Sequence, residues 1–149
     1  MKRLLPFILL LISCKAIDNY NYLTLPRFDI YYGDFGEITD YSDISRYLRN
    51  NTEYLYEGIN HYIQGPEETV ELKTGDCDDF AVLFLNIAYT ELGIKGNLVY
   101  VNSNERTIVN GGIPNHVIVE YDGIAFDPVY RNTYTNVMYR YTFGEVFND

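Results

Sequence analysis

The fold of this 149-residue chain is decided by the stretch TGDCDDFA at residues 74–81. Apolar residues follow at helical spacing until Gly93, a residue suited to end a helix. Asp76 can cap the start of this helix, and Asp79 can complete a capping box three residues later. The pattern predicts a largely buried helix with Cys77 in its first turn, where the positive end of the helix dipole favours a thiolate.

The size and charge of the chain limit its architecture and its partners. A chain of this length suits one domain. The formal net charge is −10, and no basic cluster follows the first three residues, so no nucleic-acid partner is expected. The sixteen tyrosines are expected to pack against amphipathic strands and half-buried loops.

The beginning of the chain has the features of an export signal. A basic start at residues 1–3 precedes an apolar run that is too short to span a bilayer and has the length of a signal-peptide core. The run ends in LISC at residues 11–14, which resembles the lipobox of bacterial lipoproteins. The alternatives are an ordinary cleaved signal or a short membrane anchor.

The lipobox resemblance implies a division of the chain into three parts. Residues 1–13 would be a lipoprotein signal peptide, residues 14–36 a lipidated N-terminus and tether, and residues 37–149 the folded domain. Cys14 would carry the lipid and anchor an exported protein to a membrane, at the periplasmic face or the cell surface. Cys77 would then be the remaining thiol of an exported domain, where an unexplained cysteine is unusual; a buried, inert cysteine is the alternative.

The periodicity of apolar residues changes from helical to alternating along the chain. Helices are predicted at residues 40–50 and 53–63, and a further helical turn begins at Pro66. After Gly93, alternation predicts an antiparallel sheet, and helices followed by such a sheet indicate an α+β fold. The predicted strands are residues 96–102, 115–121, 124–129 and 137–143. A polar loop at residues 102–112 joins the first two strands.

The turn signal Asp122-Gly123 predicts a hairpin that brings two chemically useful side chains together. A two-residue turn would set His116 opposite Val129 on the return strand. Asp127 would then lie opposite Ile118, on the same face as His116. Such diagonal neighbours lie roughly 7–8 Å apart at Cα, within reach of an imidazole and a carboxylate.

A nucleophilic thiol needs a base, and the base needs a group that orients it. The chain has two histidines, and His61 falls in a polar part of a predicted helix, where a surface position is expected. The residues therefore predict a constellation of Cys77, His116 and Asp127.

Three motifs resemble those of the bacterial transglutaminase-like cysteine peptidases. GDCDDFA at residues 75–81 resembles the cysteine motif of that superfamily, NHVIVE at residues 115–120 its histidine strand, and FDP at residues 126–128 its Asp-Pro strand. The resemblance covers roughly residues 62–130, with the motifs in the expected order. It implies a papain-like fold, in which a central helix packs on an antiparallel sheet.

The same resemblance implies the roles of the site residues. Cys77 would be the nucleophile, His116 the general base and acid, and Asp127 the orienting group. The substrate would be a protein or peptide whose amide bond is cleaved or transferred through a thioester. Gln64 is the candidate oxyanion donor beside the N–H group of Cys77, and the alternative is that Gln64 merely ends a helix.

Asp76, Asp78 and Asp79 form an acidic cluster around the cysteine, and clustered carboxylates suit calcium. We favour the simpler interpretation that they bond backbone amides at the helix start, and we expect no cofactor. A calcium-responsive domain is therefore a minor hypothesis. The main alternative to an enzyme is a non-catalytic surface lipoprotein that keeps the fold to bind a partner.

Overall fold

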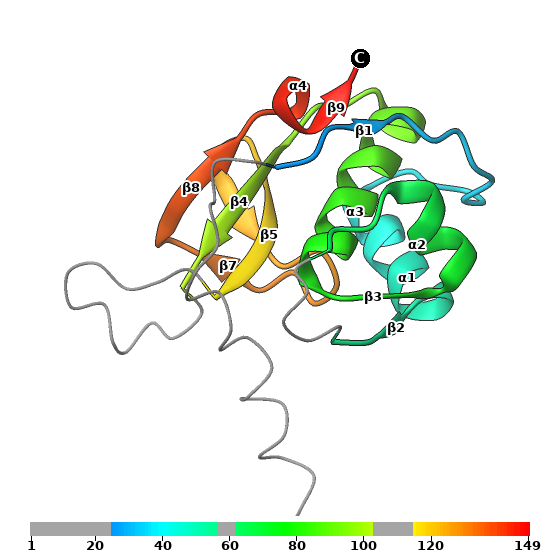
Figure 1. The fold of residues 1–149 in the computed structure, drawn as a ribbon, viewed down its shortest axis with the longest axis horizontal. Coiled ribbons are helices and arrows are strands. Elements are labelled where there is room, and N and C mark those ends of the chain that lie inside the picture. Colours follow the sequence, from blue (N-terminus) through cyan, green and yellow to red (C-terminus); the bar gives the residue numbers. More distant parts are fainter. Residues whose placement is uncertain (1–24, 57–61, 103–114) are drawn as a thin grey trace, which may run out of the picture.

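A computed structural model of the chain describes residues 25–56, 62–102 and 115–149. Within these ranges four helices lie beside a curled antiparallel sheet, which confirms the predicted α+β class (Figure 1). The helices are α1 (Tyr41–Asn51), α2 (Pro66–Leu72), α3 (Cys77–Leu92) and α4 (Phe143–Val146). The strands are β1 (Phe28–Asp29), β2 (Glu53–Tyr54), β3 (Thr74–Gly75), β4 (Asn97–Val101), β5 (His116–Tyr121), β6 (Ile124–Phe126), β7 (Thr133–Tyr134), β8 (Val137–Tyr141) and β9 (Phe147–Asn148).

Some predictions fall outside the described residues. They are the signal segment with the lipidation site Cys14, the histidine His61, and nearly all of the polar loop predicted at residues 102–112. The division of the chain into signal, tether and domain therefore stays a prediction.

Helix α3 begins and ends where the sequence predicts. The carboxylate of Asp76 accepts the N–H of Asp78 at 3.3 Å, and Asp79 returns a bond to the N–H of Asp76 at 2.9 Å, which completes the capping box. Gly93 ends the helix with φ of +69°, a left-handed conformation that glycine adopts without strain. Ten consecutive residues from Asp79 to Ala88 are buried, so neighbours cover the helix on all sides.

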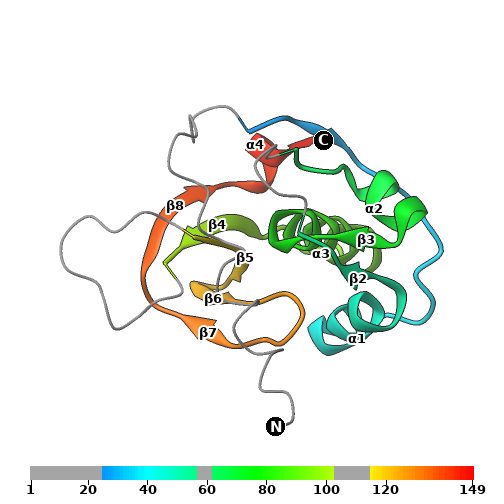
Figure 2. The same ribbon diagram turned by 60° about the horizontal axis from the view of Figure 1, so that its bottom comes forward.

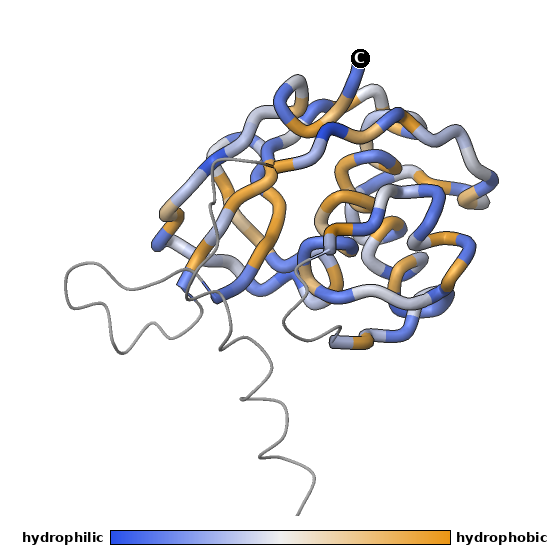
Figure 3. Tube along the Cα trace, in the orientation of Figure 1, coloured by the Kyte–Doolittle hydropathy of each residue, from blue (hydrophilic) through white to orange (hydrophobic). Residues whose placement is uncertain are grey.

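The neighbours of α3 are the sheet and two shorter helices. β5 and β4 pack on one side, and α1 and α2 pack on the others (Figure 2). Figure 3 shows apolar residues along α3 and along the strands that face it. Phe84 is fully buried in this core, and burial of a side chain of that size contributes about 1.5–3 kcal/mol. Packing on every side thus fixes the position of the first turn of α3.

The main sheet has the strand order β7-β6-β5-β4-β8, and each neighbouring pair is antiparallel. Val117, Val119 and Tyr121 of β5 point into the core around α3. Ile118 points to the opposite face, where it packs with Val99 and the other members of a smaller core. The sheet curls away from α3 (Figure 2), and Tyr134 of β7 and Val137 of β8 pack against this smaller core. Strand β5 is therefore covered on both faces.

The β5–β6 hairpin confirms the predicted register. Tyr121 pairs with Ile124 across a two-residue turn. Asp122 and Gly123 in that turn have φ of +51° and +77°, as a tight hairpin with right-handed twist requires.

The return strand is shorter than predicted, because the chain turns immediately after β6. Asp127 donates its N–H to the carbonyl of Asn132 at 2.8 Å, and Arg131 donates its N–H to the carbonyl of Asp127 at 2.8 Å. The predicted strand at residues 124–129 therefore ends at residue 126, and the predicted pairing of His116 with Val129 is wrong.

The predicted helix at residues 53–63 is wrong in its described part. Glu53 donates its N–H to the carbonyl of Lys73 at 2.8 Å, and Leu55 donates to the carbonyl of Gly75 at 2.9 Å. These bonds belong to the parallel pair β2–β3. Leu55, one of the apolar residues of the predicted helix, is 52% exposed.

The other helices lie close to their predicted positions. α1 is capped by Asp40, and its apolar face buries Ile44 and Leu48 completely. α2 begins at Pro66, as predicted. The last predicted strand, residues 137–143, ends two residues early, because a capping box starts α4 after Tyr141.

The segment ahead of α1 is fastened to the rest of the domain. β1 pairs in parallel with β9. The side chain of Asn86 in α3 accepts the N–H of Tyr31 at 2.9 Å and donates to its carbonyl at 2.8 Å. Arg27 donates to the carbonyls of Gly144 and Phe147. The core thus includes contacts with residues that precede the first helix.

Candidate active site

Cys77 is the first residue of α3, and the capping box fixes the backbone at this point. It is half-buried and is the only cysteine in the described ranges. Gly75, two residues earlier, passes so close to Asp79 that a Cβ at residue 75 would lie 2.8 Å from the Asp79 Cβ. The glycine of the motif is therefore needed for a close approach of the strand to the helix start.

Asp79 joins the helix start to a second segment. Its carboxylate is completely buried and accepts the N–H of Gln64 at 2.7 Å and the N–H of Asp76 at 2.9 Å. A buried carboxylate is stable only when such donors satisfy it. Asp79 therefore links residue 64 to the turn that carries Cys77 through these two hydrogen bonds.

His116 and Asp127 meet at one end of the β5–β6 hairpin. His116 is the first residue of β5, and Asp127 follows the last residue of β6. Nε2 of His116 lies 2.9 Å from Oδ2 of Asp127, and their side chains are only 16% and 12% exposed. The contact that the hairpin predicts is therefore present, although Asp127 lies just outside the ladder.

The turn after β6 holds the other oxygen of Asp127. Oδ1 accepts the N–H groups of Val129 and Tyr130, each at 2.8 Å. Burial raises the pKa of the Asp127 carboxyl, but the bonds from His116 and these two N–H groups outweigh burial and hold the pKa below its ordinary value. The carboxylate is thus ionised near neutral pH and fixed in one orientation.

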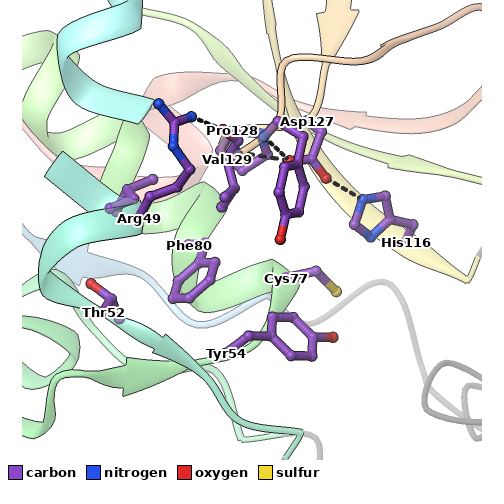
Figure 4. Close-up of a pocket in the computed structure, with 11 residues that line it drawn as sticks. Arg49, Thr52, Tyr54, Cys77, Phe80, His116, Asp127, Pro128 and Val129 are labelled. Carbon is purple, nitrogen blue, oxygen red and sulfur yellow. Dashed lines mark hydrogen bonds and ion pairs between the residues drawn. The ribbon is translucent and has the colours of Figure 1, made fainter. Parts of the chain in front are cut away.

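Cys77, His116 and Asp127 line one pocket of about 480 Å³. Figure 4 shows the side chain of Cys77 on the same side of the pocket as the His116 ring. Because Nε2 bonds Asp127, Nδ1 is the ring nitrogen left for the thiol. A carboxylate at Nε2 favours the tautomer with the proton on that nitrogen, which leaves Nδ1 able to accept a proton. An imidazole held by a carboxylate in this way is suited to accept a proton at Nδ1.

Gln64, the candidate oxyanion donor, is 1% exposed and is not among the residues that line this pocket. Its backbone is held next to the start of α3 through Asp79. Its predicted role stays a prediction.

The three acids around Cys77 bond backbone amides. Asp78 accepts the N–H of Asp79 at 2.9 Å, and Asp76 and Asp79 accept the bonds of the capping box. Burial, then the bond with Asp76 and the charges of Asp76 and Asp79, raises the pKa of Asp78 well above its ordinary value. Asp78 therefore takes up a proton at a higher pH than an ordinary carboxyl does. The three carboxylates also lie close enough to hold a cation, so the calcium hypothesis stays a prediction.

Sequence reasoning missed most of the pocket wall. Arg49 and Thr52 come from α1 and the residue that ends it, Tyr54 comes from β2, and Tyr130 comes from the turn after Asp127. Of these, only Tyr130 lies close in sequence to a motif. Arg49 and Thr52 reach the pocket because α1 packs on α3, and Tyr54 does so because β2 pairs with β3. No local pattern indicates either contact.

A family model described as a transglutaminase-like domain matches residues 36–126, more than half of the chain. The match includes Cys77 and His116 and ends one residue before Asp127. No curated protein matches the chain. Within the described ranges, no helix has the length and apolar character needed to cross a membrane.

Proposed function

Since the chain belongs to the family of transglutaminase-like domains, we propose that it is a thiol enzyme that cleaves or transfers peptide or isopeptide amide bonds. Cys77 is the nucleophile, His116 the base and acid, and Asp127 the group that orients the imidazole. The observation that carries the proposal is the bond between His116 and Asp127 in the wall of the pocket that also holds Cys77. The proposal includes a papain-like core, which the packing of α3 against the sheet supports.

The reaction has two halves. In the first, Nδ1 of His116 takes the thiol proton of Cys77, and the sulfur attacks the amide carbonyl carbon. The C–N bond breaks, the proton passes to the departing amine, and a thioester remains on the sulfur. In the second half, water or an amine attacks the thioester carbonyl, and the thiol is regenerated. Water gives hydrolysis, which we propose as the main outcome, and an amine gives a new amide.

The start of α3 suits the charge that develops on the carbonyl oxygen. The N–H of Cys77 lies at the positive end of the helix and would donate to that oxygen. We propose the side chain of Gln64 as the second donor, because the hydrogen bond from the Gln64 N–H to Asp79 keeps residue 64 beside the same helix end.

The proposal also covers the location of the enzyme. The LISC sequence at residues 11–14 supports lipidation at Cys14 after export, with the domain tethered to a membrane face. A membrane-tethered enzyme of this kind would act on protein or peptide substrates at that face.

Thiol reactivity tests the proposal directly. Alkylation of Cys77 by iodoacetamide is measured in the full chain, with the modified peptide quantified by mass spectrometry. His116→Ala should slow alkylation at pH 6 at least about tenfold, because the imidazolium no longer stabilises the thiolate. His61→Ala changes the other histidine and serves as the matched control. Equal rates in the wild type and His116→Ala would refute the enzyme and leave a binding scaffold.

The thioester itself gives the second readout. A panel of peptide amides and esters is incubated with the wild type, and the intact mass is searched for an acyl adduct. The adduct should map to Cys77 and be absent from Cys77→Ala. An adduct that persists in Cys77→Ala would mean that another residue is the nucleophile.

A further inference from the structure

The pocket that holds Cys77 contains an arginine that the proposed reaction does not use. Arg49 lies in the last turn of α1, is exposed, and lines the pocket together with Cys77 and His116. Its Nη1 donates to the carbonyl of Val129 at 2.6 Å. That bond holds the guanidinium against the pocket wall, as Figure 4 shows.

Within the described ranges, Arg49 forms no ion pair with a carboxylate, and its bond partner is the carbonyl of Val129. It is also the only lysine or arginine among the described residues that line this pocket. Asp127, the acid of the same wall, is already engaged by His116 and two backbone N–H groups. Three other cations of the described chain do form ion pairs: Arg46 with Asp43, Lys95 with Asp149, and Arg140 with Glu120.

The guanidinium has an edge left for a ligand. Nη1 is used by Val129, whereas the structure gives Nε and Nη2 of Arg49 no bond within the described ranges. The spacing of Nε and Nη2 matches that of the two oxygens of a carboxylate. Because the bond to Val129 already holds the guanidinium in place, the side chain loses little conformational entropy when it binds a ligand.

The rest of the wall is mainly apolar and aromatic. Phe80 and Tyr54 meet edge to face, with ring centroids 5.9 Å apart. A ligand that fills the pocket would therefore have an apolar body and one anionic group. The other apolar and aromatic members of the wall are Leu48, Pro128, Val129 and Tyr130.

We propose that the pocket selects acyl donors that carry a carboxylate beside the scissile amide, and that Arg49 is the residue that binds this carboxylate. The substrate class is then an acidic peptide, with the aliphatic part of the acidic residue against the apolar wall. This inference rests on the proposed function, because it takes Cys77 as the acceptor of the acyl group.

Two reagents that differ in one group test the inference. Chloroacetyl-glutamic acid α-amide and chloroacetyl-glutamine α-amide carry the same electrophile, and only the first has a side-chain carboxylate. The sulfur of Cys77 forms a bond to the methylene carbon, the C–Cl bond breaks, and chloride leaves while His116 takes the thiol proton. The ratio of the two alkylation rates at Cys77 is measured in the full chain, so that any change in thiol reactivity cancels.

We expect the wild type to react about tenfold faster with the glutamic acid reagent, and the preference to fall as salt is added. Arg49→Gln keeps a donor for the Val129 carbonyl but removes the charge, so the ratio should fall to about one. Arg49→Glu should reverse the preference. Arg46→Gln, on the same helix but outside the pocket wall, is the matched control and should keep the wild-type ratio.

A ratio near one in the wild type, or an unchanged ratio in Arg49→Gln, would overturn the inference. The proposed function would still stand if alkylation by iodoacetamide depended on His116. Conversely, a clear preference for glutamic acid with no dependence on His116 would support the carboxylate site and refute the enzyme.

Discussion

Asp127→Asn perturbs the site with the least change in shape. Oδ1 of Asp127 accepts two backbone N–H groups at 2.8 Å, so the amide oxygen of asparagine must keep that position. The amide nitrogen then faces Nε2 of His116, where Oδ2 was at 2.9 Å. Two donors cannot face each other, so Nε2 must become an acceptor, and the ring proton moves to Nδ1. The nitrogen proposed to take the thiol proton is then already protonated.

The size of the effect follows from the bond that is lost. The Asp127 side chain is 12% exposed, so solvent screens the interaction only in part. A hydrogen bond to a charged group contributes about 1.5–3 kcal/mol, which corresponds to a factor of about 10 to 150 in a rate that needs the imidazolium. We expect alkylation of Cys77 by iodoacetamide at pH 6 to slow by that factor.

The assay measures alkylation of Cys77 from pH 5 to pH 9. At pH 9 an ordinary thiol ionises without help, so the rates of the wild type and Asp127→Asn should converge. A uniform loss at all pH values would instead indicate blocked access to the thiol. An unchanged rate and pH profile in a folded Asp127→Asn protein would refute the reasoning about the tautomer.

The same carboxylate predicts a pH dependence of stability. The pKa of Asp127 is lower in the folded protein than its ordinary value near 3.8. Its contribution to stability is therefore present above that value and is lost as pH falls through the lower folded pKa. The difference in unfolding free energy between the wild type and Asp127→Asn, measured by urea denaturation, should shrink as the pH falls below about 4. A difference that grows in acid would contradict this sign.

Two further substitutions test the supports of the site. Gly75→Ala places a Cβ 2.8 Å from the Cβ of Asp79 and should destabilise the protein by about 1–3 kcal/mol in urea unfolding. Gly144→Ala, where the nearest atom would lie at 3.8 Å, is the matched control and should be close to neutral; equal costs would contradict the close-approach argument. Asn86→Ala removes both bonds to the backbone of Tyr31 and should cost about 2–4 kcal/mol. Hydrogen exchange at the Tyr31 amide should accelerate in parallel, and unchanged protection there would show that other contacts hold the segment.

Local signals in the sequence were sufficient for α3 and for the hairpin. Asp76 and Asp79 specify a helix start whose bonds lie within four residues, and Gly93 specifies its end. The Asp122-Gly123 turn fixes the register of β5 and β6, because a two-residue loop leaves no freedom in the pairing. Both elements depend on bonds between residues that are close in sequence.

The error at residues 53–63 has the opposite origin. Glu53 and Leu55 find their partners some twenty residues later, at Lys73 and Gly75, and no local pattern indicates that pairing. The apolar spacing fitted a helix by coincidence, since the side chain of Leu55 remains exposed. Short strands that pair with distant segments, such as β1 and β9, escape prediction for the same reason.

The candidate site was predictable in part. The alternation of side chains along the hairpin strands predicted that His116 and Asp127 lie on one face. The two side chains do meet, although β6 ends at Phe126 and Asp127 lies outside the paired residues. The bonds that hold the carboxylate come from the turn at Val129, which sequence reasoning had assigned to a strand. Arg49 gave no signal at all, because its place in the pocket depends on how α1 packs.

The attachment of the first described segment determines how the domain would bear tension. A pull on the chain ahead of residue 25 would first reach Arg27 and the β1–β9 pair, and then the double bond between Tyr31 and Asn86. These contacts involve the second half of α3, whereas Cys77 is its first residue. Tension applied through a membrane anchor at the beginning of the chain would therefore load these contacts before it reached Cys77.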